Sequence, residues 1–331
     1  MTKINRKTGD NNPMLLFEDA FLQVKNEIEK ALTGSPLIIR EYLSHLTLSQ
    51  GKYIRAFSVL TASLNADRMV ADDAVKAAAA IEVLHLASLV HDDIIDDSEL
   101  RRGSITLQKQ YGKKTAVICG DYLLSLALRM LSGINEKEDY KSLRFPDYVG
   151  RLCLGELNQH INNHNLDLSL YTYLKIISGK TAALFEAAFF AGAVTGKKTE
   201  KEVESYKKIG HCIGMIFQLS DDCLDFDTTM LEAQKPVQSD YDNGVITLPL
   251  IHALHNDVSF KSHAQKGNLT RKEVDEAVRK SDGLGFTRIM INRYYSKAMK
   301  AIKMLSIENN AVAEVIALLD KAARFDQKKK A

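Results

Sequence analysis

Cysteine and proline are scarce in this chain of 331 residues, and it lacks both a long apolar run and a charge excess. The four cysteines, at 119, 153, 212 and 223, include no C-x-x-C pair, which argues against a disulfide framework and a cysteine zinc site. Lys and Arg number 44 against 42 Asp and Glu, so no global charge indicates a nucleic-acid-binding protein. Glu82 and Glu186 interrupt the two most apolar stretches, and the first residues lack an apolar segment. We therefore expect no transmembrane helix, no secretory signal and a cytoplasmic location.

The scarcity of proline favours long helices. The five prolines lie at 13, 36, 146, 236 and 249, and the stretches between them are rich in Ala and Leu, the strongest helix formers. The sequence therefore predicts a nearly all-α protein, folded as a single domain over 1–331 with flexible tails at about 1–12 and 327–331. The 3.6-residue periodicity predicts helices over 14–33, 36–47, 51–65, 71–98, 114–134, 146–164, 169–195, 200–228, 246–256, 271–281, 283–306 and 308–326.

Two acidic clusters of the form D-D-x-x-D end two of the apolar predicted helices. The first is Asp92-Asp93-Ile94-Ile95-Asp96, and the second is Asp221-Asp222-Cys223-Leu224-Asp225. Carboxylates four residues apart share one helix face, and here they crowd the partially negative end of a helix. Such a cluster needs a cation, and all-oxygen ligands favour Mg²⁺ that shares its shell with phosphate oxygens. Two copies therefore indicate several Mg²⁺ ions on one diphosphate, whereas exposed acidic helix ends are the simpler alternative.

Basic residues complete this predicted anion site. Lys52 and Arg55 lie three apart near the start of a helix, and Arg101 and Arg102 closely follow the first cluster. Lys180 lies inside an apolar helix, where an ammonium group has to find an anion or shift its pKa. Surface ion pairing would explain the two arginines equally well, but it explains Lys180 poorly.

The histidines near the first cluster allow two interpretations. His85 lies seven residues before Asp92, on nearly the same helix face, so it is a candidate donor to a bound anion. His91 and Asp92 could instead form part of a metal-hydrolase site. That alternative needs further histidine ligands, and only His160 and His164 stand at helical spacing, without an H-E-x-x-H motif.

At these residues the sequence resembles the trans-type polyprenyl diphosphate synthases, and within them the catalytic component of heptaprenyl diphosphate synthases. The likeness covers roughly 45–255. Its motifs are Gly51-Lys52-x-x-Arg55, His85 to Asp96, Arg101-Arg102-Gly103, Gly120-Asp121, Gly155-Glu156-x-x-Gln159, Lys180-Thr181, Gln218-x-x-Asp221-Asp222-x-x-Asp225 and Thr247-Leu248-Pro249. One departure is Val245, which stands where the family often has a lysine that contacts diphosphate.

The resemblance implies a fold, a reaction and a set of site residues. The fold would be a bundle of about 10–13 helices around a deep central cavity, and the reaction would be 1′–4 condensation of isopentenyl diphosphate onto an allylic diphosphate. Mg²⁺, three ions per site, would be held by Asp92, Asp93, Asp96, Asp221 and Asp222, with Asp225 assisting. The allylic diphosphate would contact Arg101, Lys180 and Lys235; isopentenyl diphosphate would contact Lys52, Arg55, His85 and Arg102; Thr181 and Gln218 would lie near the reacting carbons.

Small residues before the first acidic cluster predict a long product. Ala87 and Ser88 leave room where short-chain members of the family often place aromatic residues, and Ser88 lies closer to the Asp92 face of the helix. Ile81 and Leu84 would form part of a deeper floor. We expect an all-trans product of about six to eight isoprene units, heptaprenyl above all, for a quinone side chain. A geranylgeranyl synthase is the shorter alternative.

Other functions remain open at this point. A terpene cyclase would need neither a second D-D-x-x-D nor the isopentenyl residues Lys52, Arg55 and His85. A catalytically silent binding subunit would not need intact acidic clusters. The family is dimeric, so we expect a homodimer or a heterodimer with a small regulatory subunit, without nucleic acid, and a product that is delivered to a membrane.

Overall fold

The computed structural model describes residues 13–47, 51–101, 103–135, 147–226, 241, 243–267, 269–305 and 309–323. The predicted tails at 1–12 and 327–331 lie outside these residues. The chain divides into two compact units. The first unit comprises Met1–Pro146, Ala187–Lys207 and Leu305–Val315; the second comprises Asp147–Glu186, Lys208–Met304 and Ile316–Ala331. That the whole chain acts as a single domain stays a prediction.

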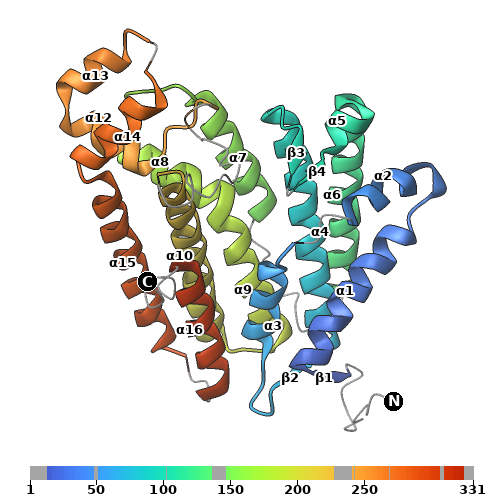
Figure 1. The fold of residues 1–331 in the computed structure, drawn as a ribbon. Helices are drawn as coiled ribbons and strands as arrows, with labels where there is room; N and C mark the ends of the chain where they lie inside the picture. The colour runs from blue at the N-terminus through green and yellow to red at the C-terminus, as the bar shows by residue number, and fades with distance from the viewer. Residues whose placement is uncertain are drawn as a thin grey trace. The chain divides into compact units, whose positions relative to one another are not determined.

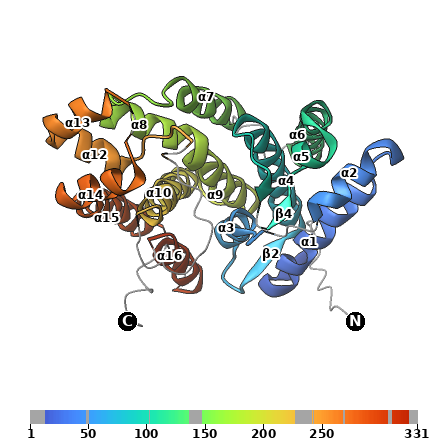
Figure 2. The same ribbon diagram turned by 45° about the horizontal axis from the view of Figure 1, so that its top comes forward.

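The first unit is built around one long helix, α4. Its elements are β1 (Met14–Leu16), α1 (Phe17–Thr33), α2 (Leu37–Thr47), α3 (Ile54–Ser63), β2 (Met69–Ala71), α4 (Asp72–Ile95), β3 (Leu100–Arg101), β4 (Ser104–Ile105), α5 (Leu107–Tyr111) and α6 (Lys113–Asn135). Helix α4 packs against α1, α3, α5 and α6, and it runs beside α6 in both ribbon views (Figures 1 and 2). Its alanine-rich run 77–81 is buried on every face, as expected for an interior helix.

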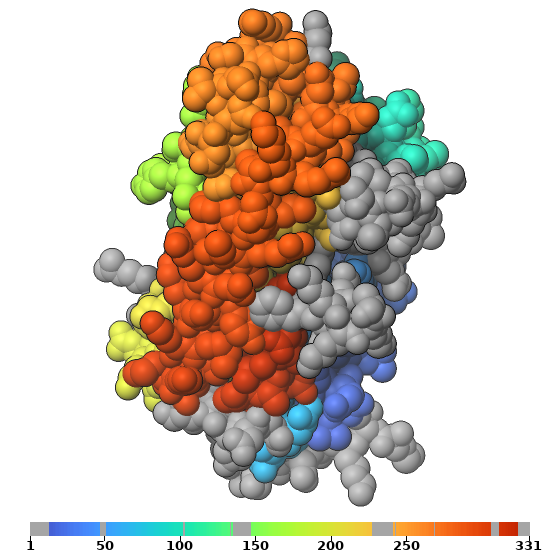
Figure 3. All heavy atoms as spheres, turned by 60° about the vertical axis from the view of Figure 1, so that its left-hand side comes forward, coloured from blue at the N-terminus to red at the C-terminus, as the bar shows by residue number. Residues whose placement is uncertain are grey.

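The second unit is also helical. Its elements are α7 (Tyr148–Ile161), α8 (Leu170–Ile177), η2 (Ser178–Ala182), α12 (Leu248–Asn256), α13 (Val258–Ala264), α14 (Arg271–Lys280) and α15 (Gly283–Ile302). Helices α9 (Ala183–Thr195), α10 (Glu200–Leu224) and α16 (Asn309–Ala323) contribute residues to both units. Helix α12 packs against α13, α14 and α15, and the orange residues of these helices form the front surface in Figure 3.

The all-α prediction is confirmed, with local corrections where elements are too short for a periodic signal. The described residues contain two small antiparallel sheets that were not predicted: β1 pairs with the distant β2, so that Met14 opposes Ala71, and β3 pairs with β4 in a hairpin. The first predicted helix therefore begins at Phe17 and not at residue 14. The short helices α5 and α13 were also missed.

The helix predicted over 169–195 is interrupted by one π-helical segment, η2. Two glycines place this segment directly against α7. A Cβ atom added to Gly155 would lie 2.2 Å from the backbone nitrogen of Lys180, and one added to Gly179 would lie 2.7 Å from the Arg151 carbonyl oxygen. The two backbones therefore touch, which only glycine permits. Single π-turns occur frequently at functional sites, and this one contains Lys180 and Thr181.

Among the described residues, three helical stretches are long and apolar enough to cross a membrane by length and composition alone: Asp72–Ile95, Lys113–Ser132 and Leu170–Thr195. The protein buries 67% and 83% of the most apolar window in the first and third, but only 33% in the second. The expectation that no segment crosses a membrane therefore stays a prediction.

Candidate active site

The first acidic cluster forms the C-terminal end of α4. Asp92 is half-buried, Asp96 is exposed and caps the helix, and its N–H donates to the Asp92 carbonyl oxygen at 2.9 Å. Asp93 is turned inward and is only 7% exposed. The two outer carboxylates, which their spacing places on one helix face, are thus the accessible members of this cluster.

Arg101 reaches the inner aspartate of this cluster. Its Nε donates to Asp93 Oδ1 at 2.6 Å, and the backbone N–H of Ser98 donates to the Asp93 carbonyl oxygen at 2.9 Å. Burial raises the pKa of Asp93, Arg101 lowers this pKa and nearby Asp96 raises it; the net shift of the pKa is upward. The β3–β4 hairpin thereby places a guanidinium beside the carboxylates, and contact of Arg101 with a diphosphate stays a prediction. Arg102 lies outside the described residues.

The predicted isopentenyl residues of the first unit lie at the start of α3 and on α4. Lys52 is exposed, Arg55 is half-buried in the first turn of α3, and His85 is half-buried on α4. Glu82 on α4 accepts a hydrogen bond at 2.8 Å from the backbone N–H of Ala56. This contact fixes the start of α3 against α4, and sequence spacing offered no signal for it.

The hydrolase alternative gains no support from the described residues. His91 Nε2 lies 3.2 Å from Asp121 Oδ1 on α6 and packs against Gly120. His164 has a left-handed backbone, and its N–H donates to the Gly244 carbonyl oxygen at 2.7 Å. Within the described part of the chain, no three His, Cys, Asp or Glu side chains are grouped closely enough to hold a metal ion alone.

The residues proposed to set product length lie on α4. Ile81, Leu84 and Ala87 are buried, whereas Ser88 is half-buried. The Ser88 hydroxyl donates to the His85 carbonyl oxygen at 2.8 Å. Of the four, Ser88 thus retains accessible surface on the same face of α4 as Asp92. Their role in chain length stays a prediction.

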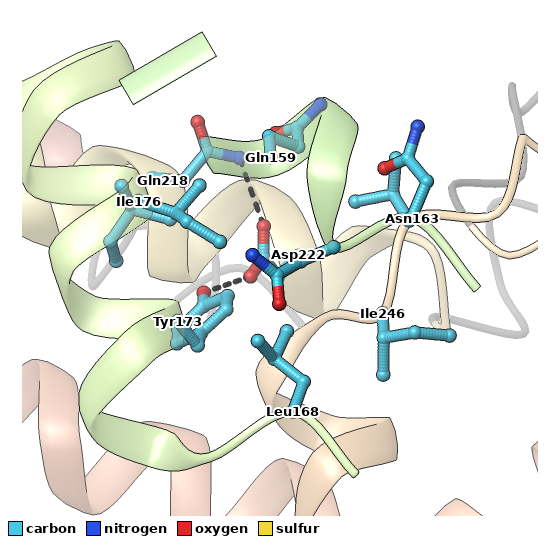
Figure 4. A pocket seen from close by; sticks show the side chains of 11 residues that line it. Gln159, Asn163, Leu168, Tyr173, Ile176, Gln218, Asp222 and Ile246 are labelled. Carbon is cyan, nitrogen blue, oxygen red and sulfur yellow. Dashed lines mark hydrogen bonds between the residues drawn. The ribbon is translucent and has the colours of Figure 1, made fainter. Parts of the chain in front are cut away.

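The second acidic cluster ends α10. Asp221 is half-buried, and the other two carboxylates are buried: Asp222 is 1% exposed and Asp225 is 7% exposed. The Tyr173 hydroxyl donates to Asp222 Oδ2, and Gln218 Nε2 donates to Asp222 Oδ1 at 2.9 Å (Figure 4). Burial raises the pKa of Asp222 to about 6, against the two donors and with help from the neighbouring carboxylates.

Arg271 was missed by sequence reasoning because it lies on α14, far along the chain from this cluster. Its guanidinium donates to the Asp225 carbonyl oxygen, pairs with Asp275 at 2.9 Å and lies 5.1 Å from the Phe226 ring centroid. A cation at the C-terminal end of α10 offsets the partial negative charge of that helix end. Arg271 therefore stabilises the helix end that bears the acidic cluster.

The π-helical segment places Lys180 and Thr181 next to polar residues of the second unit, Glu156 and Gln218. Lys180 Nζ lies 3.0 Å from Glu156 Oε1, so the anion that its apolar surroundings predicted is this buried carboxylate. The Thr181 hydroxyl donates to Gln218 Oε1 at 2.7 Å. The structure thus gathers Thr181, Gln218 and Asp222 in one unit.

A pocket in the second unit opens beside Asp222. Polar Gln159, Asn163 and Gln218 line it together with apolar Leu168 and Ile246 (Figure 4). Val245 also lines it, so the position where the family often has a lysine faces this pocket with an uncharged side chain. Lys235 lies outside the described residues.

The carboxylate oxygens of the two clusters fit Mg²⁺ whose coordination shell is completed by other oxygen ligands. Each cluster offers only carboxylate oxygens, and each has an inner aspartate whose pKa is raised, chiefly by burial. A cation would relieve the cost of these crowded charges. No group of three or more such ligands exists among the described residues, so a Mg²⁺ ion bound here would take its other ligands from water and phosphate, the arrangement that Mg²⁺ prefers.

Glu186 forms a separate buried charge network in the second unit. Arg151 donates to its Oε2 at 2.9 Å, while His211 Nδ1 and the Tyr148 hydroxyl lie at 3.6 and 3.4 Å from its two oxygens. Burial alone would raise the pKa of Glu186, but His211 and Arg151 lower it from 4.5 to about 2. This network joins α7, α9 and α10 and serves stability.

Glu186→Gln is therefore expected to destabilise the fold by roughly 3 kcal/mol at neutral pH. Because the folded pKa is depressed, the contribution of Glu186 is complete above pH 4.5 and disappears as the pH falls toward about 2. Urea unfolding at several pH values measures this as a gap between wild type and variant that closes in acid. Glu204→Gln, at an exposed pair with Lys207, serves as control. A gap independent of pH would contradict the assignment.

Comparison with known proteins agrees with this arrangement. A model of the polyprenyl synthetase family matches residues 36–281. Heptaprenyl diphosphate synthase component 2 of Bacillus subtilis is 33% identical over 288 residues, which cover 85% of this chain and 81% of that protein. The crystal structure of heptaprenyl diphosphate synthase from Staphylococcus aureus is similar, with a TM-score of 0.83 and 32% identity, over 94% of this chain and 98% of that one.

A third relative was solved with ligands. Polyprenyl synthase from Caulobacter crescentus, complexed with calcium and isoprenyl diphosphate, gives a TM-score of 0.79 at 30% identity, over 96% of this chain and 98% of that one. The family model spans most of the chain, including both acidic clusters, and the solved relatives share its all-α isoprenoid synthase fold. The chain therefore belongs to the polyprenyl synthetase family and is a prenyl-transferring enzyme that makes trans-polyprenyl diphosphates.

Proposed function

We propose that the enzyme adds isopentenyl diphosphate units to farnesyl diphosphate and makes heptaprenyl diphosphate for a quinone side chain. The observation that carries this proposal is that each D-D-x-x-D cluster ends a buried helix and is accompanied by cationic or donor side chains from other elements. The names of the Bacillus and Staphylococcus relatives support the product length. Half-buried Ser88 supports an open path for a long tail.

Both clusters would hold one allylic diphosphate through three Mg²⁺ ions. Asp92 and Asp96 in the first cluster and Asp221 in the second offer the more accessible carboxylates, while Asp93 in the first and Asp222 and Asp225 in the second are buried. The Caulobacter relative, solved with calcium and isoprenyl diphosphate, supports a divalent ion with such a ligand. When bound, Mg²⁺ would neutralise charge on the departing diphosphate.

The chain's own side chains would hold the two substrates and exclude water. Arg101 and Lys180, with Lys235, would hold the allylic diphosphate as its C–O bond breaks and the electron pair moves to oxygen. Lys52, Arg55 and His85, with Arg102, would hold isopentenyl diphosphate so that its double bond attacks the allylic carbon. The new C–C bond forms, and the proton leaves to the departing diphosphate oxygen. Apolar surroundings would exclude water, which would otherwise quench the cation.

The oligomer would be a dimer. Helix α6 exposes Val117, Ile118 and Leu128, apolar surface suited to another chain. We favour a second copy of this chain as the partner. A small regulatory subunit is the alternative, which the word "component" in the Bacillus relative's name favours. Light scattering of the purified chain measures the mass directly.

The deciding experiment incubates the purified chain alone with Mg²⁺, farnesyl diphosphate and labelled isopentenyl diphosphate, and sizes the products. We expect a ladder that ends near seven isoprene units. Labelled product only after a small partner is added would establish the heterodimer. Release of diphosphate from farnesyl diphosphate without incorporation of label would instead indicate a cyclase and overturn the proposal.

A further inference from the structure

A chain of hydrogen bonds connects the second acidic cluster to Thr181. It runs from the Tyr173 hydroxyl to Asp222, from Gln218 to the other oxygen of Asp222, and from Thr181 to the amide oxygen of Gln218. The four side chains come from three segments, α8, η2 and the part of α10 that belongs to the second unit. Tyr173 is buried and lies on the face of α8 that meets the pocket of Figure 4.

The direction of every bond in this chain follows from Asp222. An ionised carboxylate only accepts hydrogen bonds, so the NH₂ end of Gln218 has to face it. The amide oxygen of Gln218 then points to Thr181, whose hydroxyl has to donate. The orientation of Asp222 therefore fixes both the amide of Gln218 and the proton of the Thr181 hydroxyl.

Asp222 accepts hydrogen bonds from neutral donors, and in this it differs from Asp93, the inner aspartate of the first cluster. Asp93 is paired with the positively charged Arg101, whereas Asp222 is held by a phenol and an amide. Neutral donors orient a carboxylate and leave its negative charge in place. Tyr173 thus supplies geometry to the second cluster without cancelling charge that a cation would use.

We propose that Tyr173 is a positioning residue for prenyl transfer: its hydroxyl fixes Asp222 and, through Gln218, the dipole of Thr181. This inference rests on the proposed function, in which Thr181 and Gln218 lie at the reacting carbons. Partners of this kind, one step removed from a bound ion, typically change affinity or activity about 10–100-fold.

Tyr173→Phe tests the proposal because it removes one oxygen and keeps the ring. We expect kcat for isopentenyl incorporation to fall about 10–100-fold. Calorimetric titration of Mg²⁺ and inorganic diphosphate, without turnover, is expected to show weaker binding to this variant. Tyr171→Phe is the matched control, since it removes a hydroxyl from an exposed tyrosine on the same helix. Urea unfolding establishes that both variants fold.

A double-mutant cycle separates positioning from simple support of the fold. If the hydrogen bonds act as one unit, Tyr173→Phe combined with Thr181→Val lowers kcat by much less than the product of the single effects. Two outcomes would overturn the inference while wild type still makes prenyl product. One is that the effects of the two single substitutions on kcat multiply in the double variant. The other is that Tyr173→Phe has the same kcat and diphosphate affinity as Tyr171→Phe. An inactive wild type, with or without a small partner, would overturn the proposed function and this inference with it.

Discussion

Asp92→Ala is expected to lower isopentenyl incorporation by about 10²–10³-fold, a loss of ~3–4 kcal/mol of transition-state stabilisation. Asp92 is a half-buried outer carboxylate of the first cluster, at the last turn of α4. Charge develops on the diphosphate oxygen only as the C–O bond breaks. A group that acts on that charge, through a bound cation, affects kcat more than substrate binding.

The measurement is steady-state incorporation of labelled isopentenyl diphosphate at saturating Mg²⁺. Asp97→Ala is the matched control, because Asp97 stands next to the motif, is exposed and pairs with Lys113 at 2.9 Å. Removing that surface pair is expected to leave turnover close to wild type. If Asp92→Ala retained wild-type turnover while folded, Asp92 would have no part in the reaction.

Replacing Asp93 or Asp222, the inner aspartates of the two clusters, would lower activity partly for a different reason. Asp93 already forms an ion pair with Arg101, and Asp222 accepts hydrogen bonds from Tyr173 and Gln218. Removing either leaves a donor that lacks its partner, so stability should fall together with activity. Asp92 is the clearer test of the chemistry because its half-buried carboxylate lies on the accessible side of the first cluster.

The long helices and the two acidic clusters were predictable because their signals repeat along the sequence. Helix α4 begins at Asp72, one residue after its predicted start, with Asp72 and Asp73 in its first turn, and Lys180 does find an anion. Both follow from local rules: acidic residues favour helix starts, and a buried ammonium needs a partner.

What sequence reasoning missed depends on contacts between distant residues. Glu156 as the partner of Lys180, Tyr173 on Asp222 and Arg271 on Asp225 all join separate helices. No periodicity encodes such pairs. The π-turn at Lys180 was missed for a similar reason, since it accompanies the contact between Gly155 and Gly179, and neither glycine alone signals it.

Ser88→Phe is expected to shorten the product without abolishing turnover. Ser88 lies four residues before Asp92, about 6 Å along the helix, so a growing tail that starts at the acidic cluster would pass it early. Its half-buried side chain leaves space that a phenyl ring would fill, whereas Ala87, at 2% exposure, is already packed. A ring at position 88 would therefore close the path, while one at 87 would disturb the core at about 1–3 kcal/mol.

Chromatography of the dephosphorylated products measures their length. Ser88→Ala removes the hydroxyl that donates to the His85 carbonyl oxygen and adds no bulk, so it is expected to keep the wild-type length. A shorter product from both Ser88→Phe and Ser88→Ala would show that the lost hydrogen bond, and not added bulk, shortens the product. A shorter product from Ser88→Phe alone identifies this face of α4 as the wall along which the tail grows, and an unchanged ladder in both variants would place that wall elsewhere.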